Sequence, residues 1–170
     1  QARNWMRHVM ELYFLLNQLP SIVLDTQKFP NFDSTITAAM QTEGQMFLDN
    51  VMWGSSSKLT DMLLTNTTFV NTKLAQLVYN IPVPSGAAVD KFVQATLPSD
   101  QRAGILTNSA FLTARSRADG QDLISRGKTI KAAFLCLPTA PPTDMATQMA
   151  VQAASKTLDQ QTGQEQAASR

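Results

Sequence analysis

The chain has 170 residues, 44% of them hydrophobic and 16% charged, with a formal net charge of +1. This length is enough for one domain with a substantial core, or for two small domains that share an interface. The charge balance argues against nucleic-acid binding. The presence of one cysteine excludes an internal disulfide, and the presence of one histidine excludes a multi-histidine metal site. No apolar run is long enough to cross a bilayer.

Periodic apolar residues predict a first helix over 4–19. They recur at the three- and four-residue spacing of one helix face and comprise Trp5, Val9, Leu12, Leu16 and Leu19. Nearby methionines and aromatic residues widen this surface, so we expect the helix to be buried on more than one side. Pro20 ends the pattern.

A second helix is predicted to run from Asp33 or Ser34 to about Trp53. Both residues are of the types that cap helix N-termini, and Gly54 supplies a stop. Glu43 and Asp49 lie on this helix, but a spacing of six residues does not place them on one face. Acid–base catalysis by this pair is therefore a weak hypothesis.

The middle of the chain alternates short helices with turns, with a turn predicted to begin at Asn66 and a short helical segment predicted over 109–114. Asn71 is well placed to cap a helix over 72–79. The segment 80–89 contains Pro82, Pro84 and Gly86, which makes it the best candidate for a joint between sub-domains. The segment 92–97 is predicted to be either a short strand or an extended arm.

Two Arg/Gly pairs mark the segment 101–144. Arg102 precedes Gly104, and Arg126 precedes Gly127. We expect each arginine to bind helix-terminal carbonyls or a carboxylate such as Glu43, which would lock a loop onto a helix; a ligand-binding role is the alternative. Gly127 lies inside an apolar helix predicted over 122–137, where glycine costs about 1 kcal/mol of helix propensity. It indicates either a close backbone approach or a later helix start.

The end of that helix carries Cys136, Pro141 and Pro142. We interpret Cys136 as a small hydrophobic residue on an apolar face. The alternative, in an exported and longer protein, is a disulfide to a cysteine beyond Arg170. The prolines favour an extended exit from the helix. The Ala- and Gln-rich remainder is either a loosely attached helix or disordered.

These elements predict a mainly α fold, an irregular helical bundle with long loops and at most minor β structure. The predicted organisation is a helical domain over 1–81, a linker over 82–95, a second helical domain over 96–144 and an Ala/Gln-rich tail over 145–170. The chain starts at Gln1 without Met, and we expect it to be a piece of a longer protein.

The sequence contains no GxGxxG, P-loop, HExxH, GxSxG or CxxCH motif. We therefore predict no catalytic residue and no metal ligand, and we assign no cofactor-binding residue. The candidate residues are structural ones: Glu43, Asn71, Arg102, Gly104, Arg126, Gly127, Cys136, Pro141 and Pro142.

Two ordered blocks resemble bacterial domains of unknown function. The run FPNFDSTITAAMQTEGQMFLDNVMWGSSSKLTDMLLTNTTFVNTKLAQLVYNI resembles DUF1592, with its FPxF loop, its Glu-bearing helix and its TFVN segment. The runs RAGILTNSAFLTARS and RGKTIKAAFLCLPTAPPTD are similar to DUF1588, with its RG, FL and LLC elements and its proline-rich exit. Two departures from the second pattern are Ala103 in place of Gly and Gln121-Asp122-Leu123 in place of a TSP element.

The resemblance implies a setting rather than a reaction. Such domains usually belong to exported multidomain proteins, at the periplasm or cell surface, in which a CxxCH motif follows the proline-rich exit. It implies haem c in an adjoining segment and no cofactor within this chain. The families carry no assigned reaction, so no catalytic residue is carried over.

Three hypotheses follow. The first is a helical scaffold of an exported c-type-cytochrome-like protein, supporting electron transfer or redox chemistry by an adjoining haem-bearing segment or subunit. The alternative is a cofactor-free binding or assembly module of a cell-surface complex. The third is a hydrolase of a surface polymer that uses carboxylates such as Glu43 and Asp49.

Overall fold

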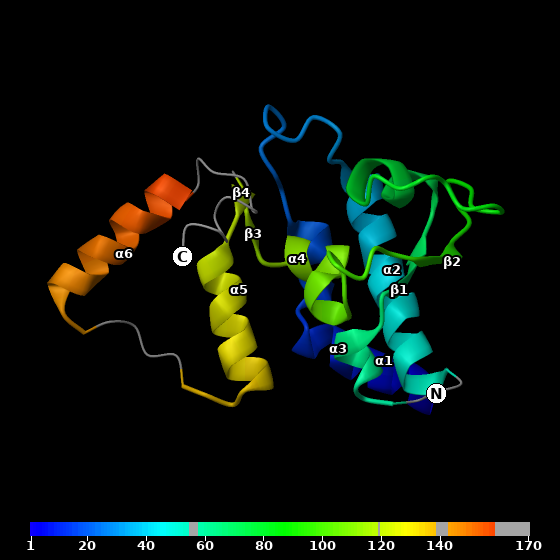
Figure 1. Cartoon of the computed structure of the whole chain (residues 1–170), viewed down its shortest axis with the longest axis horizontal. Helices are drawn as coiled ribbons and strands as arrows, with labels where there is room; N and C mark the ends of the chain where they lie inside the picture. Colours follow the sequence, from blue (N-terminus) through cyan, green and yellow to red (C-terminus); the bar gives the residue numbers. More distant parts are fainter. Residues whose placement is uncertain (55–57, 119, 139–142, 159–170) are drawn as a thin grey trace. The chain divides into compact units, whose positions relative to one another are not determined.

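The computed structural model describes residues 1–54, 58–118, 120–138 and 143–158 and divides the chain into two compact units, 1–114 and 115–170 (Figure 1). Helices dominate both units, and the described residues form two antiparallel ladders of two strands each. The predicted fold class, mainly α with minor β structure, is confirmed. Among the described residues, no helix combines the length and the apolar character that crossing a membrane requires.

The first unit is built around one long helix, α2 (Ser34–Trp53), which runs through the unit in Figure 1. Its neighbours come from before and after it in the chain, so α2 is buried on several sides. They are α1 (Ala2–Tyr13), the 3₁₀ helix η1 (Leu16–Ser21), α3 (Asp61–Leu64), β1 (Thr67–Val70), the π-helix η2 (Leu74–Val78) and α4 (Ser109–Thr113).

The predicted ends of α2 are confirmed. Asp33 is the N-cap, and Gly54 is the C-cap in an extended conformation, with φ −73° and ψ −177°. The helix contributes much of the apolar core, which also draws on η1, η2 and α4. The largest fully buried apolar side chains of this core are Leu16, Leu19, Leu48, Val70, Leu74, Ile105 and Phe111.

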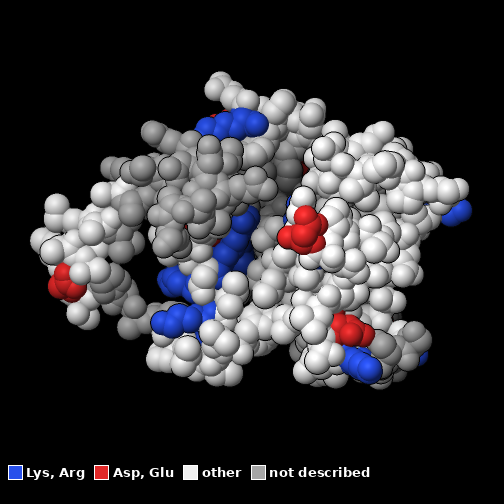
Figure 2. All heavy atoms as spheres, in the orientation of Figure 1, with Lys and Arg blue, Asp and Glu red and all other residues white. Residues whose placement is uncertain are grey.

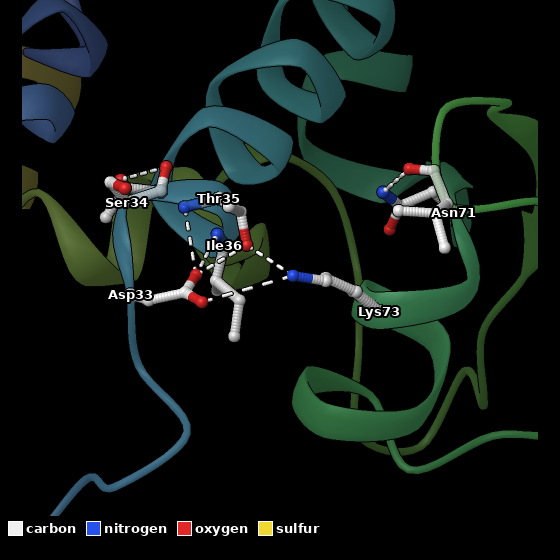
Figure 3. Close-up of polar contacts among 8 residues, drawn as sticks. Asp33, Ser34, Thr35, Ile36, Asn71 and Lys73 are labelled. Carbon is white, nitrogen blue, oxygen red and sulfur yellow. Dashed lines mark hydrogen bonds and ion pairs between the residues drawn. The ribbon is translucent and has the colours of Figure 1, made fainter.

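The start of α2 is fixed by a small polar cluster (Figure 3). Asp33 Oδ1 accepts hydrogen bonds from the backbone N–H groups of Thr35 (2.9 Å) and Ile36 (3.0 Å). Lys73, the helical residue directly before η2, donates from Nζ to Thr35 Oγ1 (2.5 Å), and its Nζ lies 4.0 Å from Asp33 Oδ2. The hydrogen bond from the Thr35 hydroxyl and that from the Ile36 N–H hold the pKa of Asp33 below its usual value of 3.8, and the charge of Lys73 acts in the same direction.

We expect Asp33→Ala to lower the urea midpoint at neutral pH, and Asp33→Asn to keep it close to wild type, because asparagine caps helices equally well. A carboxyl group whose pKa is lower in the folded protein than in the unfolded chain stabilises the fold at pH values above its unfolded pKa. This stabilisation is lost as the pH falls through the folded pKa. The Asp33→Asn variant should therefore lose less stability than wild type below about pH 4. Parallel acid titrations of the two proteins would contradict this.

The first helix differs from its prediction. The α-helix ends at Tyr13, Leu15 takes a left-handed conformation (φ 59°), and the chain continues as η1 with Pro20 inside it. Because the α-helix ends before Leu15, the apolar residues of the predicted helix do not form one buried face: Leu16 is buried, while Trp5 is 67% exposed. The expectation that this helix is buried on more than one side is wrong.

A two-stranded ladder joins distant segments of the first unit. β1 pairs antiparallel with β2 (Val93–Thr96), with Thr67 opposite Thr96 and Val70 opposite Val93. The segment 92–97 was predicted to be either a strand or an extended arm, and a strand is observed. The residues of β1 were predicted to form a turn. The predicted domain limits stay a prediction. The two compact units reflect how the chain packs, and they do not test the boundaries between families.

The second unit contains the strands β3 (Ser116–Arg117) and β4 (Gly120–Gln121), the helices α5 (Leu123–Thr129) and α6 (Met145–Leu158), and the π-helix η4 (Ile130–Phe134). Asp122 caps α5 by accepting from the Ser125 N–H (2.8 Å). The helix predicted over 122–137 thus ends earlier, at Phe134.

Cys136 follows with φ 51° and is exposed, so its interpretation as a buried hydrophobic residue is wrong. Pro141 and Pro142 lie outside the described residues.

Gly127 lies in the middle of α5, and no described heavy atom lies within 4 Å of the Cβ that another residue would place there. Neither a close approach nor a later helix start explains it. We expect Gly127→Ala to raise the free energy of unfolding by about 0.5–1 kcal/mol, because alanine loses less backbone entropy on folding. Urea unfolding followed by circular dichroism tests this, and a destabilised variant would contradict it.

Candidate functional site: the buried Glu43 carboxylate

Glu43 lies in the middle of α2 with its side chain fully buried. Oε1 accepts hydrogen bonds from the hydroxyls of Thr68 and Tyr79, the latter at 2.5 Å, and Oε2 accepts one from the Ser109 hydroxyl. The Tyr79 Oη also accepts from the Ser109 backbone N–H (3.1 Å). Four segments of the chain therefore meet at one carboxylate, which we call the Glu43 hub.

Local structure explains why each member points inward. The strand β1 alternates its side chains, so Thr68 and Val70 face the core while Phe69 is only half-buried. Asn108 caps α4 by accepting from the Ala110 N–H (3.0 Å), which places Ser109 at the first helical position. Gly44 lets η1 and α4 approach α2 next to the hub, because a Cβ there would lie 2.9 Å from Leu16 Cδ1.

Opposing effects act on the pKa of Glu43. Burial raises the pKa of Glu43, whereas the hydrogen bonds from Ser109, Thr68 and Tyr79 and the positive charge of Arg102 lower it, and the net direction is upward. Burial, together with the charge and the hydrogen bond of Glu43, raises the pKa of Tyr79 well above 10. Tyr79 therefore remains a protonated donor across the physiological range.

Arg102 lies beside the hub. Its Nη1 donates to the Thr107 carbonyl (3.0 Å), at the end of the 3₁₀ helix η3 (Ile105–Thr107), and its guanidinium carbon lies 5.3 Å from the centre of the Tyr79 ring. Its charge acts on Glu43 without a hydrogen bond between them. Of the two partners expected for this arginine, the structure shows the helix-terminal carbonyl.

Gly104 shapes the same loop. It has φ 57° and ψ −164°, and its N–H donates to the Thr65 carbonyl (2.6 Å). A Cβ at this position would lie 2.5 Å from the backbone of Leu63, so only glycine fits. Arg102 and Gly104 of the predicted set are thus brought to the Glu43 hub.

The remaining candidates lie elsewhere. Asn71 lies just before the helical residues that lead into η2 and accepts from the Leu74 N–H (2.9 Å), and its Nδ2 donates to the Val89 carbonyl (2.7 Å), which fastens the loop before β2. In the second unit, Arg126 donates from Nη2 to Ser116 Oγ (3.4 Å). Cys136 and Gly127 also belong to that unit.

The geometry of the hub is that of a structural hydrogen-bond network and not that of a catalytic pair of carboxylic acids. Asp49 lies on another side of α2, where its Oδ2 binds Arg7 Nη1 at 2.6 Å, and it does not pair with Glu43. In the part of the chain that the structure describes, no three His, Cys, Asp or Glu side chains are grouped as metal ligands. Where Figure 2 draws the first unit, charged side chains stand singly or beside one of opposite sign.

Sequence reasoning named Glu43 but missed its three donors. Thr68 was assigned to a turn, Tyr79 was taken only as the end of a helix, and Ser109 was taken only as a helix start. The signal that could have found Thr68 is the alternation in TTFV, which fits a half-buried strand. No local pattern connects Tyr79 with Ser109, because they are 30 residues apart.

Comparison with known families assigns the residues of the hub to two matched segments. Residues 1–81 match the family model PSD4, a protein of unknown function (DUF1592), and residues 102–170 match PSCyt3, a protein of unknown function (DUF1588). Neither a curated protein nor a solved structure matches the chain. Glu43, Thr68 and Tyr79 come from the first matched segment, and Arg102 and Ser109 come from the second.

Proposed function

We propose that this chain, whose residues 1–81 and 102–170 match the DUF1592 and DUF1588 models of unknown function, is a helical scaffold module of an exported c-type-cytochrome-like protein. In this role it carries no haem itself. It holds an adjoining haem-bearing segment or subunit, at the periplasm or cell surface, and that partner performs the electron transfer or redox chemistry.

The observation that carries the scaffold role is the Glu43 hub. Three hydroxyl groups occupy the carboxylate, and they join residues 43–79 to residue 109 inside one compact unit. A buried polar network whose members are all satisfied rigidifies a fold and specifies one arrangement of its segments. Such a network supports holding a partner in place, and both oxygens of the carboxylate are engaged by hydroxyl donors.

The test of the redox part is an absorption spectrum. The uninterrupted gene product is expressed in a host that attaches haem c, purified from the periplasmic fraction and reduced. We expect the sharp visible bands of a c-type cytochrome in the full-length product and none in residues 1–170 alone. A full-length product without haem bands rules out the redox part, and recovery only from the cytoplasm rules out export.

The alternative, a cofactor-free binding or assembly module, is favoured by the apolar surface of α1. Trp5 is 67% exposed, and Tyr13 is also exposed. Solvent-exposed aromatic residues of this kind are typical of surfaces that contact a partner. The discriminating observation is whether the gene encodes CxxCH beyond Arg170, since the haem hypothesis requires it and the assembly hypothesis does not.

A further inference from the structure

A groove of about 430 Å³ opens to solvent at the C-terminal end of α2, within the first unit. One side is a single face of α2, because its lining residues Met46, Asp49, Asn50 and Trp53 are spaced i, i+3, i+4 and i+7. The N-terminal turn of α1, which lies beside this end of α2 (Figure 1), forms another side. The volume lies in the range of sites that bind small molecules.

The apolar part of the groove is mainly aromatic. Trp53, the last residue of α2, is 41% exposed, and the guanidinium carbon of Arg3 lies 5.2 Å from the centre of its ring. This contact uses one face of the indole and fixes the orientation of the ring. Phe69 also lines the groove, because β1 turns Thr68 and Val70 toward the core and Phe69 away from it. The groove therefore offers flat apolar surfaces that the fold already holds in place.

The polar part of the groove consists of planar side chains. Arg7 donates from Nη1 to Asp49 Oδ2 (2.6 Å) and from Nη2 to Asn4 Oδ1 (3.5 Å), so one guanidinium holds both residues at the groove. Among the described residues, none forms a hydrogen bond with Asp49 Oδ1, with Asn4 Nδ2 or with the side-chain amide of Asn50. The groove thus keeps both donors and acceptors for a ligand.

The charges at the groove indicate a neutral ligand. Asp49 is paired with Arg7, and Arg3 lies against the Trp53 ring, so both signs of charge are present and neither is in large excess. An anion would be repelled by Asp49, and a cation would be repelled by the two arginines. A neutral ligand that carries hydroxyl groups and an apolar face avoids both costs.

We propose that this groove binds one sugar ring of a neutral saccharide. The C–H groups on one face of a pyranose ring pack on the aromatic side chains, because the face of an aromatic ring is electronegative. The hydroxyl groups of the sugar both donate and accept, and they pair with the amides of Asn4 and Asn50 and with the carboxylate of Asp49.

The role is binding and not cleavage. Among the described residues that line the groove, Asp49 is the only one with a carboxylate, whereas glycoside hydrolysis uses two. Saccharide binding goes beyond the proposed scaffold function and does not depend on haem. A chain that lacks haem partners and still binds a sugar would therefore contradict the first and leave the second intact.

Titration of cellotriose, maltotriose, mannotriose and triacetylchitotriose into the full 170-residue chain tests the proposal. NMR follows the backbone amide signals of α2 and the indole N–H signals of Trp53 and Trp5. We expect at least one of these oligosaccharides to shift the Trp53 signal saturably and to leave the Trp5 signal in place. Trp53→Ala and Asn50→Ala should each raise its dissociation constant about tenfold or more. Asn50 is exposed, so its replacement does not disturb the core.

The matched control is Trp5→Ala, since Trp5 is 67% exposed on α1 and does not line the groove. This variant should bind the oligosaccharide as wild type does. Absence of a saturable response to all of these oligosaccharides would overturn the proposal. Equal shifts with glycerol, which has hydroxyl groups but no ring, would overturn it too, and so would equal weakening by Trp5→Ala or unchanged binding by both groove variants.

Discussion

Replacing Glu43 by alanine is expected to lower the free energy of unfolding by about 3–5 kcal/mol. The substitution leaves the hydroxyls of Thr68, Tyr79 and Ser109 without their acceptor in a buried site, and it also opens a cavity where the fully buried Glu43 side chain was. Urea unfolding of the chain, followed by far-ultraviolet circular dichroism, measures the change.

The matched control is Asp49→Ala on the same helix. Asp49 pairs with Arg7 in a partly exposed position, and such pairs contribute less than about 1 kcal/mol. If the two alanine variants lose similar stability, Glu43 is not a hub. A loss of less than about 1 kcal/mol for Glu43→Ala would lead to the same conclusion.

The pH dependence of stability isolates the charge of Glu43. Burial raises its pKa in the folded state above the usual 4.5, so the folded protein binds this proton more tightly than the unfolded chain does. The resulting stabilisation is complete below the unfolded pKa and is lost as the pH rises through the folded pKa. We expect the stability of wild type relative to Glu43→Gln to fall as the pH rises above 4.5. A difference that grows with pH would contradict the raised pKa.

Local chemistry explains which parts of the fold the sequence predicts. The bounds of α2 follow from Asp33, whose carboxylate accepts the first free N–H groups, and from Gly54. The strand at 92–97 was expected as one of two alternatives. These features depend on residues within a few positions of one another, and periodicity or capping chemistry therefore detects them.

The failures have a different origin. Leu15 takes a left-handed conformation that an apolar L-residue disfavours, and it is followed by the buried Leu16 and Leu19, so local propensity does not predict the turn. Burial of Glu43 contradicts the usual exposure of carboxylates, and its donors come from up to 66 residues away. Interactions over such distances leave no periodic signal in one sequence.

Gly104→Ala is expected to destabilise the fold by about 3–5 kcal/mol, although it adds only one methyl group. With φ 57° and ψ −164°, this residue occupies a backbone region that is essentially restricted to glycine. Its new Cβ would also meet the Met62 carbonyl oxygen and lie 2.5 Å from Leu63 Cα, and backbone atoms cannot move aside as a flexible side chain can.

Gly86→Ala separates the cost of a positive φ from the cost of the steric clash with neighbouring backbone. Gly86 also has a positive φ, 85°, but its Cβ would find only Val93 Cγ1 at 3.9 Å, so the backbone conformation alone should cost about 1 kcal/mol. Equal losses in the two variants would show that the close approach at Leu63 is not real. A larger loss for Gly104→Ala would show that the contact with the backbone of Leu63 adds to the cost of the positive φ.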